Sequence, residues 1–485
     1  MAIGKDNSRA TSYELEVLTL VNNEGDGFDI RNQLIQCKIY ESITANFLIG
    51  NIVIDDGINL FEKAKIFGQE SLRIKYSQPA GLNDEVDPDD VIDKTFRVYK
   101  VDEVTKVDQD RTLFRLHFCA PELLQSKRIR VSQAFRGNLS DIVAGLCEQY
   151  LDIKNEIIPS DSHFEIREKS SGDNFHVVVP NYTLSYAINY LCRQAQGTDA
   201  ESGLQDSFFF FQTANGNFRL QSLDSMLKIK YAGNRPFAYT ETREDNPKDI
   251  PADKTDAGLV GIGRKILSYK VGTSADVLKG ITQGLFASKQ TTIDTTFKYF
   301  SERSYNFLEK FYAGKDSAID IYPFVRTAPE SIYKGGSAGE GQDVPILGAK
   351  TLDSIGSYTD ANILLKSDTQ FVHNEENKIV QVGYDAAQGS DQFRQAAKQL
   401  LEYHTVSAVL SARTDISVGQ IINLQIPVSS QGEDNIDPFF YNGDHLITEI
   451  MWKLTPSDCE THIKCIKDSV INHIETTQVE YGKSI

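Results

Sequence analysis

One β pattern occurs twice, near the two ends of the chain, and this duplication constrains the fold more than any other feature. The first copy reads GQESLRIKYS (68–77), then a long acidic gap, then FRVYKVDEVTKVDQDRTLFRLHFC (96–119). The second reads GQIINLQIP (419–427), then a long acidic gap, then HLITEIMWKLTPSDCETHIKCI (445–466). This alignment places Gly68 opposite Gly419. Self-similarity of this kind indicates a repeated structural unit, so segments 62–119 and 413–467 are predicted to form the same small β-barrel.

Alternation of polar and apolar residues predicts that the N-terminal part is β structure. Successive side chains of a strand face opposite sides of a sheet, so each alternating run can bury one face. Turn-rich or acidic gaps separate the runs, a spacing typical of a small barrel or sandwich. The runs are 13–20, 34–41, 47–55, 71–77, 95–107 and 112–119.

Helical spacing replaces this alternation after Pro121. Helices are predicted over 138–152, 181–195 and 391–404, with Ser140 and Thr183 as N-caps of the first two. Between the second and third helices, the Phe-rich run 207–223 predicts a hairpin that turns at Asn215–Gly216. The residues expected to face inward from the helices are Ile142, Val143, Leu146, Tyr150, Leu184, Ile188, Leu191, Phe393, Ala397, Leu400 and Leu401.

Composition excludes several classes of protein. The chain has 485 residues, too many for one core, and a net charge of −18. A protein that reads nucleic-acid sequence is normally basic, so specific DNA binding is not expected. No apolar run reaches the roughly 20 residues of a membrane helix, and the N-terminus lacks the apolar core of a signal peptide. The acidic stretches 83–93 and 240–249 are predicted to be solvated loops.

The C-terminal hairpin carries residues that could suggest a metal site. Cys459 and Cys465 bracket His462, and His445 lies upstream. Strand parity places Cys459 and Cys465 on one face and His462 on the other, and the two sulfurs lie roughly 20 Å apart along a strand. The six cysteines contain no CxxC pair and are expected to be reduced core residues. We therefore predict no metal site.

Motifs for catalysis are similarly weak. The stretch GGSAG (335–339) matches a nucleophile elbow around Ser337, but Gly341 and Pro345 block the helix that such an elbow needs. The stretch GLVGIGRK (258–265) lacks the spacing of a phosphate-binding loop. No pair of carboxylates is singled out among 68 acidic residues. No catalytic, cofactor-binding or metal-binding residue is predicted, no cofactor is expected, and the chain is not expected to be an enzyme.

The sequence resembles the baseplate hub proteins of contractile-tailed bacteriophages, a family related to the N-terminal part of type VI secretion spike proteins. The resemblance rests on SITANFLIGNIVIDDGINLFEKAKIFGQESLRIKY (42–76) and FRLHFCAPELLQSKRIRVSQAFRGNLSDIVAGL (114–146). It continues through VPNYTLSYAINYLCRQAQ (179–196), the Phe-rich hairpin, and the C-terminal repeat copy. It covers most of the chain and is weakest over 285–385.

This resemblance implies a β-rich α+β, multidomain fold with two tail-tube-like β-barrels plus smaller α+β domains. It also implies a structural role, as a homotrimeric ring that adapts a sixfold tail tube to a threefold central spike. The implied partners are tube or tube-initiator proteins above, the central spike protein below and other baseplate proteins, while genome DNA passes through the lumen without specific binding. The implied location is the tail baseplate of the virion, assembled in the host cytoplasm.

Two other functions stay open. One is a tail-associated peptidoglycan hydrolase, and the other is the hub of a secretion-system or phage-like contractile particle.

The predicted domains are a first tube-like barrel (1–120), an α+β domain (121–235), a linker with the first strands of the second barrel (236–275), an inserted α+β domain with a Gly-rich loop (276–390), the remainder of the second barrel (391–470) and a C-terminal tail (471–485).

Overall fold

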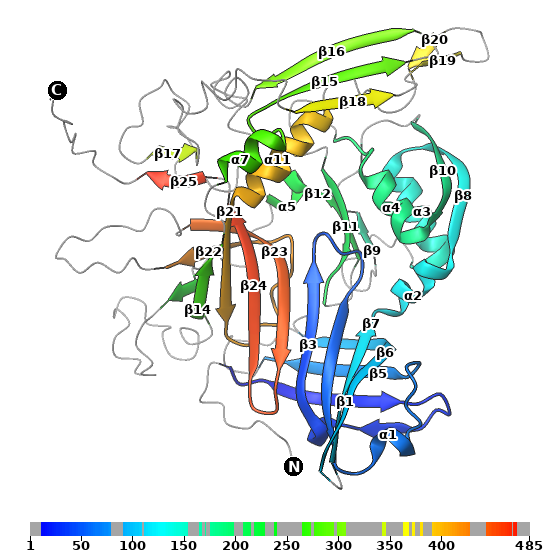
Figure 1. Cartoon of the computed structure of the whole chain (residues 1–485), viewed down its shortest axis with the longest axis vertical. Coiled ribbons are helices and arrows are strands. Elements are labelled where there is room, and N and C mark those ends of the chain that lie inside the picture. The colour runs from blue at the N-terminus through cyan, green and yellow to red at the C-terminus, as the bar shows by residue number, and fades with distance from the viewer. Residues whose placement is uncertain are drawn as a thin grey trace, which may run out of the picture.

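The computed structural model describes most of the chain in separate segments. These are residues 11–78, 91–108, 111–153, 164–166, 170, 175–197, 207–214, 218–227, 237–239, 264–272, 276–294, 298–306, 342–345, 362–367, 371–373, 379–381, 390–426, 443–467 and 469–472. A single sheet of 13 strands forms the centre of the molecule, and smaller sheets and helices lie around it (Figure 1). The fold is β-rich and multidomain, as predicted.

The N-terminal part of the large sheet has the strand order β2-β1-β5-β6-β7-β4-β3. The strands are β1 (Glu14–Val21), β2 (Gly27–Asp29), β3 (Leu34–Ser42), β4 (Ile49–Asp56), β5 (Ser71–Ser77), β6 (Ile92–Asp108) and β7 (Arg111–Cys119). The 3-10 helix η1 (Arg31–Gln33) and the short helix α1 (Leu60–Lys63) lie in the connections. The sheet curves, so that β1 and β5 run across the direction of β3 (Figure 1). All six alternating runs are confirmed as strands.

The C-terminal part of the large sheet is a closed six-stranded barrel. Its strands are β13 (Phe237–Tyr239), β14 (Lys265–Val271), β21 (His404–Leu410), β22 (Ile421–Gln425), β23 (Gly443–Leu454) and β24 (Cys459–Lys467). They follow the order β22-β13-β14-β21-β24, and β23 closes the ring by pairing with both β22 and β24. Most of the chain between β14 and β21 is therefore an insertion into this barrel.

A mixed α and β region follows the N-terminal strands. It comprises α2 (Pro121–Arg128), β8 (Arg130–Gly137), α3 (Leu139–Leu151), β9 (Phe164–Ile166), β10 (Phe175–Thr183), α4 (Leu184–Cys192), β11 (Phe208–Gln212), β12 (Phe218–Ser222) and α5 (Leu223–Leu227). Strands β11 and β12 form the predicted hairpin, although its turn at Asn215–Gly216 lies outside the described residues. The side chain of Asn138, and not that of Ser140, caps α3, because the Asn138 amide oxygen accepts the N–H of Ser140. Ser140 instead donates its hydroxyl to the same oxygen.

The insertion carries a three-stranded sheet and a long helix. Its elements are α7 (Val277–Thr282), β15 (Ala287–Asp294), β16 (Tyr299–Asn306), β17 (Gln342–Pro345), β18 (Ile363–Ser367), β19 (Phe371–His373), β20 (Ile379–Gln381) and α11 (Ser390–Tyr403). Strand β17 pairs with β25 (Ser469–Asn472) near the C-terminus. The predicted helix over 391–404 is confirmed as α11, but the side chains of Phe393, Ala397, Leu400 and Leu401 lie outside the described residues. In the other two helices, Ile142, Val143, Leu146, Leu184, Ile188 and Leu191 are buried, as predicted.

Candidate interaction surface

The two ends of the chain form two units with the same order of strands. In the first unit the order is β5-β6-β7-β4-β3, and in the second it is β22-β23-β24-β21-β14. These strands also follow each other along the chain in the same sequence, and all the pairings are antiparallel. The correspondence between the two strand orders ends at the next strand, because β1 runs antiparallel to β5 whereas β13 runs parallel to β22. We call residues 34–119 unit 1, and β14 with residues 404–467 unit 2.

Register shifts occur at matching points in the two units. The β3–β4 ladder skips a residue between Leu34 and Gln36, and the β14–β21 ladder does so between Ile266 and Ser268. The β6–β7 ladder shifts between Val98 and Lys100, and the β23–β24 ladder shifts between Ile447 and Glu449. Such bulges leave one residue of a strand without a cross-strand partner. Their coincidence fixes the alignment of β6 with β23 as far as Asp102. Beyond it, β6 has two further register shifts, between Asp102 and Thr105 and between Lys106 and Asp108, that β23 lacks.

The turns that lead into β5 and β22 are also equivalent. The Glu70 carbonyl accepts the N–H of Val98, and the Gln420 carbonyl accepts the N–H of Ile447. The side chain of Glu70 folds back onto the N–H of Phe67 at 2.8 Å. The side chain of Gln420 folds back in the same way and accepts the N–H of Ser417, three residues upstream, at 3.1 Å.

These bonds place Glu70 opposite Gln420 and correct the predicted match of Gly68 with Gly419 by one residue. Both glycines have positive φ, at 91° and 78°, a conformation that glycine adopts without a steric penalty. Each glycine therefore serves its own turn, and the two do not occupy equivalent points. The repeat was visible in the sequence, but its register was not.

Strand β3 of unit 1 joins β23 of unit 2 edge to edge. The antiparallel ladder runs from Ser42 opposite Glu449 to Cys37 opposite Leu454. These residues lie about 400 positions apart in the sequence, and the pairing makes the two units one continuous sheet (Figure 1). The junction therefore fixes the orientation of unit 1 relative to unit 2.

A buried carboxylate, Glu41, lies at this junction. It comes from β3, is 2% exposed, and accepts the N–H of Ala214 at 2.7 Å and the N–H of Val418 at 2.8 Å. Ala214 belongs to the β11–β12 hairpin, and Val418 belongs to the turn before β22. One side chain of unit 1 thus holds both neighbouring regions. Burial raises the pKa of Glu41 to about 7, and the two N–H donors oppose that shift.

The outer face of the joined sheet is polar and largely charge-paired. Strands β3, β14, β21, β23 and β24 form a hollow of about 510 Å³ on this face. The Lys464 ammonium lies 2.9 Å from the Glu449 carboxylate, and Lys453 lies 2.9 Å from Glu460. These ion pairs are half-exposed, so each adds little stability.

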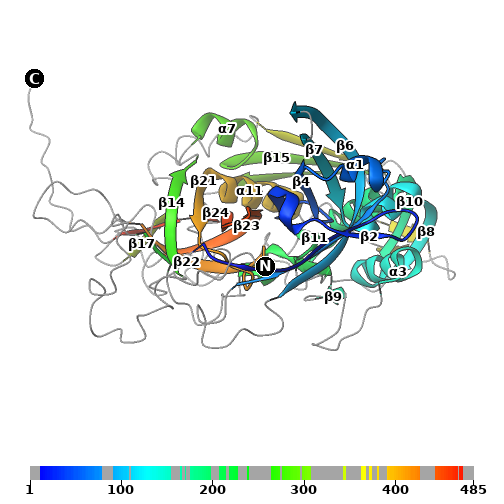
Figure 2. The same ribbon diagram turned by 90° about the horizontal axis from the view of Figure 1, so that it is seen from below.

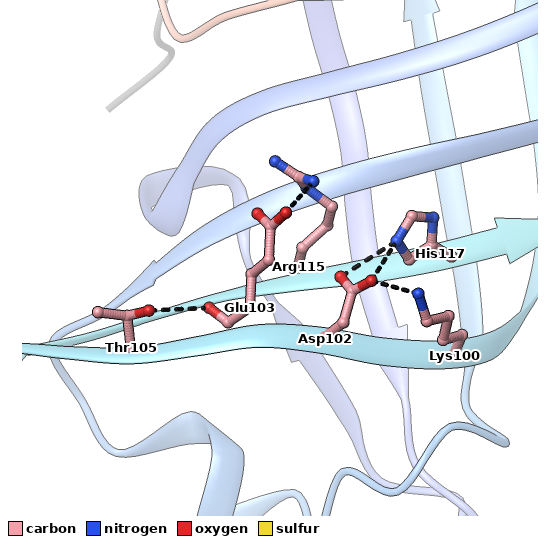
Figure 3. A network of polar contacts seen from close by, with 6 residues as sticks. All are labelled: Lys100, Asp102, Glu103, Thr105, Arg115 and His117. Atoms are coloured by element: carbon pink, nitrogen blue, oxygen red, sulfur yellow. Dashed lines mark hydrogen bonds and ion pairs between the residues drawn. The ribbon is translucent and has the colours of Figure 1, made fainter.

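Unit 1 extends this face with a second polar network (Figure 3). The Asp102 carboxylate lies 2.5 Å from the Lys100 ammonium and 3.0 Å from Nε2 of His117. The Arg115 guanidinium lies 2.6 Å from the Glu103 carboxylate. The hydrogen bond from Lys100, with a smaller contribution from His117, lowers the pKa of Asp102. The network lies where β6 extends beyond the end of β5, so its strand has a partner on one edge, β7, and none among the described strands on the other.

The predicted parity of the C-terminal hairpin is confirmed. Cys459 and Cys465 are buried on one face, while the side chain of His462 is 32% exposed on the other and lies 3.1 Å from Glu460. His445 is fully buried and its Nδ1 bonds the Gly443 carbonyl. Within the described segments, no three His, Cys, Asp or Glu side chains cluster as metal ligands would. All six cysteines are buried and free.

Some sequence features cannot be placed. Ser337 with its GGSAG stretch, and residues 258–263 of GLVGIGRK, lie outside the described residues. So do residues 83–90 and 240–249 of the two acidic stretches. No helix in the described part of the chain is long and apolar enough to cross a membrane. Nothing in the sequence singled out Glu41, since its partners are 173 and 377 positions away.

Comparison with known proteins gives structural neighbours but no sequence match. No family model and no curated protein sequence matches the chain. A tail protein from Neisseria meningitidis aligns over 94% of this chain and 97% of its own, with 10% identity and a TM-score of 0.47. The 43 kDa tail protein of prophage MuSo2 from Shewanella oneidensis aligns over 93% and 98%, with 11% identity and a TM-score of 0.47.

A third structural neighbour belongs to a bacterial secretion system. It is an Escherichia coli component of the type VI secretion system, described as structurally similar to tail proteins of bacteriophage T4. It aligns over 94% of this chain and 76% of its own, with 9% identity and a TM-score of 0.38. The neighbours are thus phage tail and type VI secretion proteins, the classes that the sequence resembles.

Proposed function

We propose that this protein is the structural hub of a contractile phage tail, a ring of three chains between a sixfold tube and a threefold spike. The observation that carries the proposal is the duplication. Units 1 and 2 share five strands, with the same pairing order and matching bulges, and lie side by side in one sheet. Three chains would therefore present six similar units to a sixfold tube.

The same ring would present the remaining regions in three copies. The α+β region, the insertion between β14 and β21 and the C-terminal tail each occur once per chain, so they match a threefold partner such as a central spike. We keep the predicted domain boundaries as part of this proposal. The role requires no catalytic group and no cofactor, and it places the protein in the tail baseplate of the virion after assembly in the host cytoplasm.

Passage of genome DNA is part of the proposed role. Lysine and arginine residues that line a bore bind phosphates with an affinity that depends on salt. A chain with a net charge of −18, in which Lys453 and Lys464 of the outer sheet face pair with Glu460 and Glu449, is expected to hold DNA weakly. We expect no binding of duplex DNA at physiological salt in a filter-binding or mobility assay. Tight binding would count against passage.

Cryo-electron microscopy of the assembled tail tests the proposal directly. We expect three copies of this chain between tube and spike, with units 1 and 2 alternating around the ring. Six copies, or a position outside the axis of the tail, would refute the hub. A particle that has the same ring but carries no DNA would assign the chain to a secretion-type particle instead.

A further inference from the structure

The edge of β23 in unit 2 is filled along its whole length. Strand β22 pairs with it up to Leu446, the N–H of Ile447 then bonds the Gln420 carbonyl, and β3 takes over from Glu449 to Leu454. Two strands thus share one edge of β23, while β24 covers the other edge. The second of these two strands comes from the other unit.

The equivalent edge in unit 1 is filled only halfway. Strand β5 pairs with β6 up to Arg97, and the N–H of Val98 bonds the Glu70 carbonyl. From Lys100 onward, no strand among the described residues pairs with this edge of β6. The side chains of Val104 and Val107 there are 53% and 57% exposed. A long unpaired edge is a ready site for another strand.

Strand β14 also has an edge that is only partly paired among the described strands. It is the equivalent of β3, and β21 covers one of its edges from Ile266 to Val271. On its other edge, β13 pairs only with Lys265 and Ile266, so no described strand covers the edge from Leu267 to Val271. The equivalent edge of β3 is the one that binds β23.

The two vacant edges cannot meet within one chain. Strands β14 and β6 lie at opposite sides of the molecule in both views (Figure 2). A contact between them therefore needs a second copy of the chain, in a head-to-tail arrangement that closes into a ring when the rotation allows it. The rotation that relates unit 1 to unit 2 across β3–β23 would then be repeated between chains.

We propose that β14 of one chain pairs antiparallel with β6 of the next, in the register of the β3–β23 ladder. Equivalent partners on β7 and β24 convert Lys38 opposite Lys453 into Lys270 opposite Thr105, and Tyr40 opposite Met451 into Gly272 opposite Asp102. Between Asp102 and Thr105, β6 has one extra residue that β23 lacks, so the new ladder would contain a bulge there. This register brings the Lys270 ammonium toward the acidic residues of the β6 network, which gives opposite charges across the contact. The inference deepens the proposed ring and rests on it for the number of copies.

Cysteine pairs test the register. Oxidation of the Lys270→Cys/Thr105→Cys variant should link chains into dimers and trimers that reducing agent separates, and each single variant should give no trimer. The six native cysteines are buried and contribute little background. The pair Lys38→Cys/Lys453→Cys, at the observed junction, is the matched control and should link within one chain without a change in mass.

A shifted pair guards against random collision. Lys270→Cys with Lys100→Cys lies about four strand positions from the proposed register, or roughly 13 Å, and should link at least tenfold less. Equal linking by this pair overturns the register. No linking between chains at millimolar protein, while the control pair closes fully, overturns the contact.

The mass of the complex separates the two proposals. Native mass spectrometry that shows trimers without the Lys270–Thr105 link would leave the ring standing and reject the strand pairing. Linked rings with another number of chains would support the pairing and reject the threefold hub.

Discussion

Units 1 and 2 share a strand order but fill their interiors differently. Unit 1 packs aromatic rings, with Phe96 and Phe118 at 4.8 Å between centroids and Phe61 and Phe114 at 5.3 Å. Unit 2 buries basic side chains, among them Arg413, which bonds Asp415 at 2.7 Å, whereas the buried charged residues of unit 1 are the carboxylates Glu41, Asp56 and Glu70. The shared backbone ladders therefore do not depend on a shared core. Hydrogen-bond register persists where side-chain chemistry has diverged.

One cross-strand pair shows how the packing was exchanged. Gly50 lies opposite Phe118 in unit 1, and the equivalent Val406 lies opposite Cys465 in unit 2. In unit 1 the small residue is on β4 and the large one on β7, whereas in unit 2 the larger residue is on β21 and the smaller one on β24. Cores tolerate such swaps when the total volume is kept. The comparison of the units can be tested at the junction between them, in their cores and on their surfaces.

The largest effect is expected at the junction. Glu41→Ala leaves the buried N–H groups of Ala214 and Val418 without their acceptor, which should cost about 3–5 kcal/mol in the free energy of unfolding. Urea unfolding monitored by the single tryptophan, Trp452 of β23, would measure it. Glu41→Gln keeps one acceptor oxygen and should lose less. Equal stability of Glu41→Ala and wild type would show that the two units hold together without this side chain.

The pH dependence of the junction follows from the raised pKa of Glu41. Its pKa of about 7 lies above the ordinary 4.5, so the folded state holds this proton longer than the unfolded state. This stabilisation is complete below about pH 4.5 and is lost as the pH rises through 7, by about 3 kcal/mol in total. Urea titrations from pH 4 to 8 should show that fall in wild type and its absence in Glu41→Gln. Parallel profiles for the two proteins would contradict the assignment.

The exchanged core pair should show a smaller, coupled effect. A Cβ at Gly50 would lie 2.4 Å from both the Lys38 carbonyl and the Phe118 ring, so Gly50→Val should cost about 2–3 kcal/mol. The pair Gly50→Val/Phe118→Cys installs the residues of unit 2 in unit 1. A double-mutant cycle on unfolding free energies should give a favourable coupling of about 1–2 kcal/mol. Simple additivity would mean that the two units do not share this packing relation.

The smallest effect is expected on the outer face. Lys464 and Glu449 are each about half exposed, so Lys464→Ala should change the free energy of unfolding by less than about 1 kcal/mol. The change should shrink further in 0.5 M salt because exposed charges are screened. A loss of unfolding free energy as large as that of Glu41→Ala would show that surface ion pairs contribute much of the stability of unit 2.

Local patterns were predictable from the sequence, and long-range partners were not. Alternation located the strands of unit 1, because each strand buries one face, and helical spacing located α3, α4 and α11. The repeat was found from the recurring sequence pattern, but its one-residue offset was set by hydrogen bonds of Glu70 and Gln420. A polar residue such as Glu41, which alternates like its neighbours, gives no sign of the two distant N–H groups that it binds.

The β3–β23 junction also orders events during synthesis. All strands of unit 1 have been synthesised once residue 119 is made, yet β3 must wait for its partner segment of β23, which begins at Glu449. Domains generally fold as units from the N-terminus, and partly folded chains with open strand edges tend to aggregate. The nascent chain thus carries an open edge for some 320 residues of elongation. Chains arrested near residue 240 should expose the amides of β3 to hydrogen exchange, whereas the finished protein should protect them.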